Sequence, residues 1–575
     1  MNIDPVVARW ALDRIHADRR HVAALAECRV RYQRGFGAIR KEERVLRAEP
    51  ISAAIGLTAL IETIIGGTAI TILGASVSAA SIGGAIVGVG LSIGLNYLAS
   101  TMQRSGTGSV PNYADSALNT PAIKYNERQA IPAKRIIFGS AQVGGALFFE
   151  RVKPPYLYQG LLVSARRITA LRKLWLGTQE ISFAQFAPNM VLTPLPVTGL
   201  PNYPDRLKVS VRLGDRNQTV DPLLHADFPN LDVSFRQRGI ATLVLRYHYG
   251  ANFEEFQALW GQVQRPNPLV LADGVPLPDP RVPGHILRWN PDDPESVAEA
   301  EASWSYSNNA ALVQTYYLTQ RFGGRIHPDR IVWDKVAEAA NWDDGLIGCL
   351  DGAFIRRHTI DGIVTLNQSP SSVLSGMLSA NRGFILESAG KSWVSSSAPR
   401  APIATIHDRI LTGAIDYRAA KPKRDLVNRV KSQFIAEDRE YQTTVGPVLT
   451  RPDLEAVDGE LLEATLNLPF TMDHRRVQRL EKAYLDTARL GAQLTVRCDV
   501  ELLANCAEDP VGNSVNVDSQ LFRNINGVWF VSSWGFADGF SAVDLALTKY
   551  DPSIETAYTA ATDERPFTLA ELDVS

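Results

Sequence analysis

The distribution of hydrophobic and polar positions divides the chain into three parts. Residues 1–50 mix apolar and charged positions at loosely helical spacing, with eleven Lys/Arg against seven Asp/Glu. Residues 63–103 hold no charged side chain and lie between Glu62 and Arg104. The remainder alternates between strand-like and helix-like stretches. The pattern predicts a basic amphipathic helical segment over 1–50 and a Gly/Ala-rich hydrophobic helical segment over 51–104.

Small residues recur at regular intervals within the uncharged part. The small residues Ser76, Ala80, Gly84 and Gly88 recur every four positions, and Gly90 and Gly94 form a second pair with the same spacing. On a helix this spacing makes a smooth strip that a second backbone can approach closely. Glycine costs a helix about 1 kcal/mol relative to alanine, so such a helix needs packing partners. We expect these residues to pack helices or contact a membrane, and the spacing favours association of identical helices. Three states stay open: a permanent membrane span, a bundle buried in protein, and a segment buried first and inserted later.

Beyond residue 104 a polar stretch with turn-forming residues predicts a linker, and β signals then dominate. Alternating or aromatic and β-branched stretches over 133–152, 156–177, 207–213 and 239–250 predict strands, with turns at Gly139 and Gly144–Gly145 and a break at Gly160. We place a β-rich domain with an insertion over 105–265.

Two further domains are expected. The first, over 266–400, begins with a Pro-rich segment that cannot be helical. It continues with a helix near 308–323, capped by Asn308 or Asn309, a helix near 328–345, and a helix, turn, strand, turn and strand over 372–396. The second, over 401–575, is β-rich and carries a helix over 471–490, with Thr471 as its cap and Gly491 at its end. The fold class is therefore α+β and multidomain.

Composition and charge exclude several classes of protein. The chain has 575 residues, a net charge of −2 and 45% hydrophobic residues, so its overall charge indicates neither nucleic-acid nor anionic-lipid binding. Its four cysteines are too few for a disulfide scaffold and lack zinc spacing, which indicates buried thiols in a reducing compartment. The charged first twenty residues do not form a secretion signal.

Motifs that could carry chemistry are weak. Gly383–Ser392 places six residues before Gly-Lys-Ser where a phosphate loop has four, so nucleotide binding is rejected. The nine histidines form no metal-binding spacing, and no pair of carboxylates stands out as a catalytic dyad. The basic run 418–431 lacks interleaved aromatics and favours a solvated edge strand over a DNA contact. We expect no catalytic residues, no cofactor and no metal, and hence no enzyme.

Several stretches occur in a recognisable order. They are RQAIPAKRIIFGSAQVGGALFF, DGVPLPDPR, WSYSNNAALVQTYYLTQRFG, IVWDKVAEAAN, RRHTIDGIVTLNQSPSSVLSGMLSANRGFILESAGKSWV and RDLVNRVKSQF. Taken in order from about residue 105 to 500, the chain resembles the tail-tip hub proteins of long-tailed bacteriophages, the family of the lambda tip attachment protein and the gene transfer agent hub.

The resemblance implies a homotrimeric ring at the distal end of a tail tube, located in the virion and made in the host cytoplasm. It implies hub β-barrel domains with inserted α/β domains, and no catalytic residues. The partners would be other copies of the chain, distal tail and other tail-tip proteins, the tape-measure protein and receptor-binding or fibre proteins. Contact with the host membrane is possible, and phage DNA would be met only in transit.

The resemblance does not cover the first hundred residues. Many relatives continue into fibronectin-like domains, whereas this chain stops at TLAELDVS, so we expect host recognition to fall to a docked protein. In a trimer the uncharged segment would plug the lumen or insert in the host envelope. Two alternatives stay open: a bacterial membrane-anchored envelope protein or enzyme with a soluble β-rich domain, and a contractile-tail or secretion-spike hub.

Overall fold

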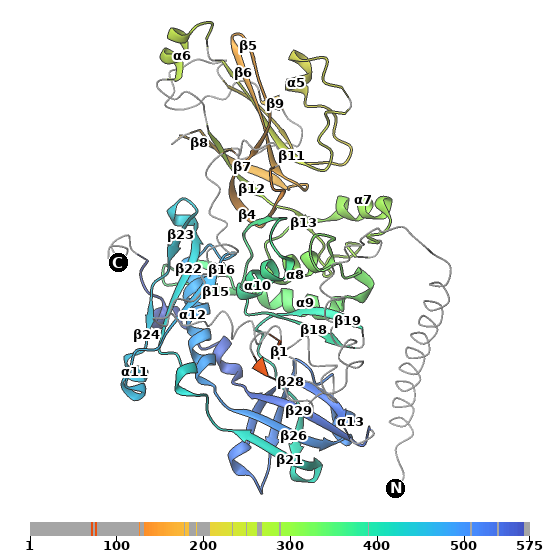
Figure 1. Ribbon diagram of the computed structural model, residues 1–575, viewed down its shortest axis with the longest axis vertical. Helices are drawn as coiled ribbons and strands as arrows, with labels where there is room; N and C mark the ends of the chain where they lie inside the picture. The colour runs from red at the N-terminus through yellow and green to blue at the C-terminus, as the bar shows by residue number, and fades with distance from the viewer. Residues whose placement is uncertain are drawn as a thin grey trace.

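The structure is a computed structural model. It describes residues 71–72, 75–76, 126, 132–176, 179–182, 191–192, 207–232, 234–248, 250–260, 267–286, 289–388, 390–506, 509–537 and 540–567. Figure 1 shows a β-sandwich at one end, a layer of helices in the middle, and two further sheets that carry the C-terminal part of the chain. The described part is mixed helix and sheet, as expected from the sequence.

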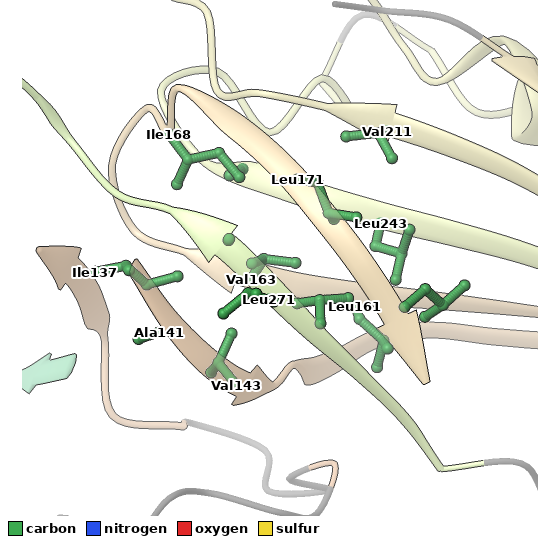
Figure 2. Close-up of a cluster of buried hydrophobic side chains, with 14 of the residues drawn as sticks. Ile137, Ala141, Val143, Leu161, Val163, Ile168, Leu171, Val211, Leu243 and Leu271 are labelled. Atoms are coloured by element: carbon green, nitrogen blue, oxygen red, sulfur yellow. The ribbon is translucent and has the colours of Figure 1, made fainter. Parts of the chain in front are cut away.

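The sandwich consists of two antiparallel sheets. One sheet has the order β5 (Ala146–Lys153), β6 (Tyr156–Ser164), β11 (Ala241–His248), β10 (Leu207–Arg212) and β9 (Val191–Leu192). The other has the order β4 (Ser140–Gly144), β12 (Pro268–Asp273), β7 (Ala170–Leu176) and β8 (Gln179–Ser182). Alternate residues of both sheets fill the space between them, and Figure 2 shows Leu161, Val163, Leu171 and Leu243 pointing into it. The helices α5 (Pro222–Asp227) and α6 (Phe253–Trp260) belong to the same end of the molecule.

Two local expectations for the sandwich differ from the structure. The predicted break at Gly160 is absent, because β6 runs through this residue, which pairs with Val244. Gly160 is needed for space, since a Cβ atom there would lie 2.9 Å from the ring of Phe148. The Pro-rich segment at 266 is extended as expected, but its first part is the inner strand β12, with Pro268 at the strand's first position. One sheet therefore includes residues on both sides of residue 265.

The middle layer is built around a fully buried helix. Its helices are α7 (Pro294–Ser303), α8 (Ala310–Thr319), η2 (Pro328–Arg330), α9 (Trp333–Asp343) and α10 (Pro370–Ser379). All ten residues of α8 are buried, which explains why its sequence has no charged residue on any side. Asn309 caps α8 by accepting a hydrogen bond from the Leu312 N–H, one of the two caps expected from the sequence.

Short antiparallel pairs surround this layer. They are β13 (Pro276–Leu277) with β14 (Ser305–Tyr306), β15 (Leu346–Gly348) with β16 (Phe354–Arg356), β17 (Gly362–Thr365) with β3 (Arg135–Phe138), and β18 (Phe384–Ser388) with β19 (Lys391–Ser395). The stretch that resembles a phosphate loop is the β18–β19 hairpin, and β19, not a helix, contains Ser392. Its rejection as a nucleotide site is consistent with this geometry.

The C-terminal part contains two sheets. The larger has the order β20 (Pro402–His407), β27 (Ser514–Asp518), β28 (Gly527–Ala537), β29 (Ala542–Lys549), β26 (Gln493–Asp499) and β21 (Leu411–Arg418). The smaller has β22 (Arg429–Ala436) between β23 (Gln442–Val445), β24 (Leu449–Thr450) and the parallel β25 (Glu463–Leu468). The remaining short elements are η3 (Asp408–Ile410), η4 (Lys423–Asp425), η5 (Glu437–Arg439), α11 (Pro452–Asp458), α13 (Glu501–Asn505), η6 (Arg523–Ile525), η8 (Pro552–Glu555) and α14 (Ala560–Asp563).

The helix expected over 471–490 is α12 (His474–Arg489), which packs on the smaller sheet through Val477, Leu480 and Tyr484. Its cap is Asp473, not Thr471, because the Asp473 carboxylate accepts the Arg475 N–H at 2.8 Å.

The expected closed barrels are not found, which corrects that part of the fold class. Within the described strands every sheet has two free ends; in the six-stranded sheet these are β20 and β21, which do not pair with each other. Closure would require backbone hydrogen bonds between the end strands. The first residue of β20 is Pro402, which has no N–H to donate.

The uncharged segment is described at four residues. Thr71–Ile72 (β1) and Ala75–Ser76 (β2) form a short antiparallel pair, where we expected helix. Thr71 and Ile72 are β-branched, and such residues favour strands over helices. Among the described residues, no helix is both long and apolar enough to cross a membrane.

Candidate functional site: a buried polar joint between domains

Side chains from four distant stretches meet where the sandwich contacts the middle layer. The Asp361 carboxylate lies at the centre of this meeting point. It accepts hydrogen bonds from the Ser140 N–H at 2.9 Å, the Thr359 hydroxyl at 2.8 Å and the Asn308 amide at 3.2 Å. Burial raises the pKa of this carboxyl above its ordinary value, while the three donors oppose the shift. The three donors give the buried carboxylate the partners that it needs.

A second carboxylate lies on the sandwich side of the same contact. Asp273, at the end of β12, is 2% exposed and accepts a hydrogen bond from the Ser140 hydroxyl at 2.7 Å. The guanidinium of Arg172 on β7 contacts both of its oxygens at 2.7 and 2.8 Å. The hydroxyl of Tyr306 on β14 lies 2.9 Å from the Ser140 hydroxyl. We call this cluster the joint; its members are Gly139, Ser140, Arg172, Asp273, Tyr306, Asn308, Thr359 and Asp361.

Two glycines bring the backbones together at the joint. Gly139 has φ of +58°, and a Cβ atom there would lie 2.3 Å from both the Asp361 Oδ1 atom and the Ile360 carbonyl oxygen. A Cβ atom on Gly274 would lie 2.1 Å from the Ile137 carbonyl oxygen. The Gly274 N–H donates to the Gly139 carbonyl at 2.7 Å, and the Val275 N–H donates to the Ile137 carbonyl at 3.0 Å. The joint is thus closed by backbone as well as side-chain hydrogen bonds.

A second polar network holds the middle layer together. The His358 ring nitrogen Nδ1 lies 3.0 Å from Asp343 Oδ1, and the other carboxylate oxygen accepts the Ala311 N–H at 3.0 Å. Asn381 donates to the same oxygen at 3.2 Å and accepts a hydrogen bond from Gln314 at 2.9 Å. These groups tie α8 to the end of α9 and to the turn after α10. Both oxygens of the Asp343 carboxylate therefore have polar partners, and this network fixes α8, α9 and α10 relative to one another.

A fourth buried carboxylate anchors the end of the described chain, a contact that we call the C-terminal clamp. Glu481 on α12 is fully buried; it accepts hydrogen bonds from Arg565 at 2.6 Å and from the Ser432 hydroxyl at 2.5 Å. Gln478 exchanges two hydrogen bonds with the Arg565 backbone, at 2.6 and 3.0 Å. The Phe567 ring stacks on His474, with ring centres 5.0 Å apart. Burial raises the pKa of Glu481 to about 7 despite the contact with Arg565.

The polar groups at these three sites join separate elements of the fold through hydrogen bonds and ion pairs. Among the described residues, no group of three or more His, Cys, Asp or Glu side chains could hold a metal ion. Burial raises the thiol pKa of Cys498 to about 12 and of Cys506 to about 11, so both are poor nucleophiles. At the joint each carboxylate receives several hydrogen bonds, and such a network holds two domains in one relative orientation.

Of the residues that we predicted as a packing or membrane strip, the structure describes Ser76 alone. Ser76 pairs with Thr71 in the β1–β2 pair. Ala80, Gly84, Gly88, Gly90 and Gly94 lie outside the described residues. The strip therefore stays a prediction.

Sequence reasoning did not select the joint residues as a site. Each of them except Arg172 lies in one of the stretches that carry the family resemblance, FGS at 138–140, DG at 273–274, SYSNN at 305–309 and HTIDG at 358–362. The signal was present as four small polar or glycine motifs at the ends of apolar runs. Their meeting in space could not be seen from their order alone.

The described architecture is an open β-sandwich locked to a helical layer, followed by two further open sheets. This arrangement is similar to that of a chain in the virion of a native gene transfer agent particle, with 15% identity and a TM-score of 0.50. The match covers 88% of this chain and 98% of that chain. At this identity the comparison shows a shared fold.

Other solved structures overlap less well. A tail protein from Neisseria meningitidis MC58 has 9% identity and a TM-score of 0.27, over 76% of this chain and 98% of that chain. The 43 kDa tail protein of prophage MuSo2 from Shewanella oneidensis has 8% identity and a TM-score of 0.25, over 74% and 96%. No protein-family profile and no curated protein matches the sequence. The fold likeness to the virion chain is thus the comparison on which a functional proposal can rest.

Proposed function

We propose that this protein is a structural component of a phage-type tail and that it forms the hub at the tail's distal end. The observation that carries the proposal is the shared fold with a gene transfer agent virion chain, which extends over 88% of this chain. The meeting of the ordered motifs at the joint supports it, because these stretches were the ones that resemble tail-tip hubs.

In this proposal the chain assembles as a homotrimer around the tube axis and docks other tail proteins. A hub must transmit force without deforming, and buried, fully hydrogen-bonded joints between domains suit that task. The uncharged segment 63–103 would plug the lumen, contact the tape-measure protein, or enter the host envelope during genome delivery. Receptor-binding or fibre proteins would dock on the outside.

Antibody labelling of particles in the electron microscope tests the location. We expect label at the end of the tail opposite the capsid; label elsewhere, or none, would contradict a hub. Mass photometry of the full chain tests the assembly, with a trimer as the expected species. A monomer that fractionates with lipid would instead support an envelope protein.

Deletion of residues 63–98 tests the role of the uncharged segment. We expect tails that assemble poorly, or particles that adsorb without delivering DNA. Infection at the normal level would show that the segment has neither role.

A further inference from the structure

A cleft of about 760 Å³ opens beside the joint, between the sandwich and α7. Its walls come from the start of β3, the end of β6, the loops that follow β10 and precede β11, and the α7–α8 region. A volume of this size accommodates several side chains of a bound segment.

The cleft is strongly cationic. Its lining includes Lys134, Arg135, Arg166, Arg167, Arg216 and Arg238. One carboxylate, Glu301, also lines it and pairs with Arg216 at 2.9 Å. Arg167 pairs with Asp215 at 3.4 Å. Within the described ranges of the chain, no carboxylate is found within 4 Å of Lys134 or Arg238, and both residues are exposed.

Aliphatic side chains form part of the remaining lining. Leu162, Val163, Ile240 and Val275 contribute to the walls, so a bound group would meet apolar surface between the cations. The cleft therefore suits a ligand that carries both negative charges and aliphatic side chains.

Nucleic acid fits this lining less well than peptide does. Single strands bind by stacking their bases on aromatic faces, and two aromatic residues line the cleft. Tyr316 is 1% exposed and Trp304 is 7% exposed, with their rings edge to face at 5.9 Å. Trp304 is fixed further by its indole N–H, which donates to the His285 carbonyl at 3.0 Å. Neither ring offers an open face for a base.

We propose that this cleft binds an extended acidic protein segment with aliphatic side chains, supplied by another protein of the particle. The charge and the lining of the cleft favour such a segment whatever the protein's role, and only the source of the segment rests on the proposed function. Long-range attraction between the cations and an acidic segment would speed docking, and the aliphatic walls would fix its register.

The test uses the purified full chain and a fluorescein-labelled ten-residue peptide that alternates Glu or Asp with Leu or Val. We expect saturable binding by fluorescence anisotropy, weakened by salt and lost for the Gln/Asn version of the peptide. The double variant Lys134→Glu with Arg238→Glu should raise Kd at least tenfold. The conservative pair Lys134→Arg with Arg238→Lys should retain binding within about threefold, as expected where charge rather than exact geometry is recognised.

A matched control changes the net charge equally at a distance from the cleft. Arg409, just before β21, and Arg418, at its end, belong to the six-stranded sheet region far from the sandwich (Figure 1), and their side chains are each 71% exposed; Arg409→Glu with Arg418→Glu should alter Kd less than twofold. Equal weakening by this pair would reduce the effect to overall charge and overturn the proposal. Absence of peptide binding would also overturn it, as would tighter binding of a single-stranded ten-nucleotide oligomer that the cleft variant abolishes. Antibody labelling of the tail is independent of these results, so the cleft can fail while the tail assignment stands.

Discussion

Gly139 is a position at which the joint has no room for a single methyl group. The substitution Gly139→Ala has two costs. Its φ of +58° is left-handed, which costs a non-glycine residue about 1–2 kcal/mol. The added Cβ atom would lie 2.3 Å from the Asp361 carboxylate and from the Ile360 carbonyl, and relieving such overpacking costs about 1–3 kcal/mol more. We expect the two contributions together to lower the stability of the joint by about 2–5 kcal/mol.

Gly459→Ala separates the two costs. Gly459 ends α11 with φ of +74°, and a Cβ atom there would have no neighbour within 4 Å. This variant should lose about 1–2 kcal/mol, and only around α11.

Hydrogen–deuterium exchange by mass spectrometry measures both effects locally, which matters because a chain with several domains does not unfold in two states. Amides of β3, β4 and β17 should exchange at least about 30-fold faster in Gly139→Ala, since 1.4 kcal/mol corresponds to a factor of ten. They should be unchanged in Gly459→Ala. If exchange in these strands is the same in both variants, the close approach at Gly139 does not hold the joint, and the argument for a rigid connection fails.

Three further substitutions probe the joint and the C-terminal clamp. Burial raises the pKa of Glu481 to about 7, so between pH 4.5 and 7 the folded protein keeps a proton that the unfolded chain releases near its ordinary pKa of 4.5. The free energy of unfolding should therefore fall by up to about 1.4 kcal/mol per pH unit as pH rises through this range. Glu481→Gln should remove this slope from melting temperatures measured across that range, and an unchanged slope would assign the proton elsewhere. Arg172→Ala should lower the local stability of β7 and β12 by about 2 kcal/mol, because buried Asp273 loses its cation and water only partly replaces the half-exposed guanidinium. A loss below about 0.5 kcal/mol in the hydrogen exchange of these strands would mean that the pair is solvated. Phe567→Ala should weaken the attachment of the C-terminal clamp by about 2 kcal/mol, because the contact with the His474 ring is lost. The C-terminus should then be more sensitive to carboxypeptidase, and unchanged digestion would contradict the clamp.

Local patterns predicted much of the fold. Alternation located β10 and β11, the Asn309 cap and an apolar run located α8, and the helix-turn-strand-turn-strand reading of 372–396 matches α10, β18 and β19. These elements depend on neighbours within a few residues. The helix α7 was missed because its Glu- and Ala-rich sequence follows an acidic loop and has no apolar stripe.

The site was less accessible to sequence reasoning. Ser140 and Asp361 are 221 positions apart, and no local signal pairs them. Gly139 could be assigned to a turn, but the carboxylate that excludes its side chain comes from another domain. The cationic cleft likewise combines residues of several loops whose approach depends on the tertiary fold.

The pairing of β3 with β17 has a consequence during synthesis on the ribosome. About 220 residues separate the two strands, so at 5–20 residues per second β3 waits about 10–45 s for its partner. During that interval the backbone hydrogen-bonding groups of β3, a strand that is buried throughout in the finished molecule, have no partner strand. Nascent chains are therefore most exposed to aggregation before residue 365 emerges, and production at low temperature or with abundant chaperones should improve recovery of soluble protein.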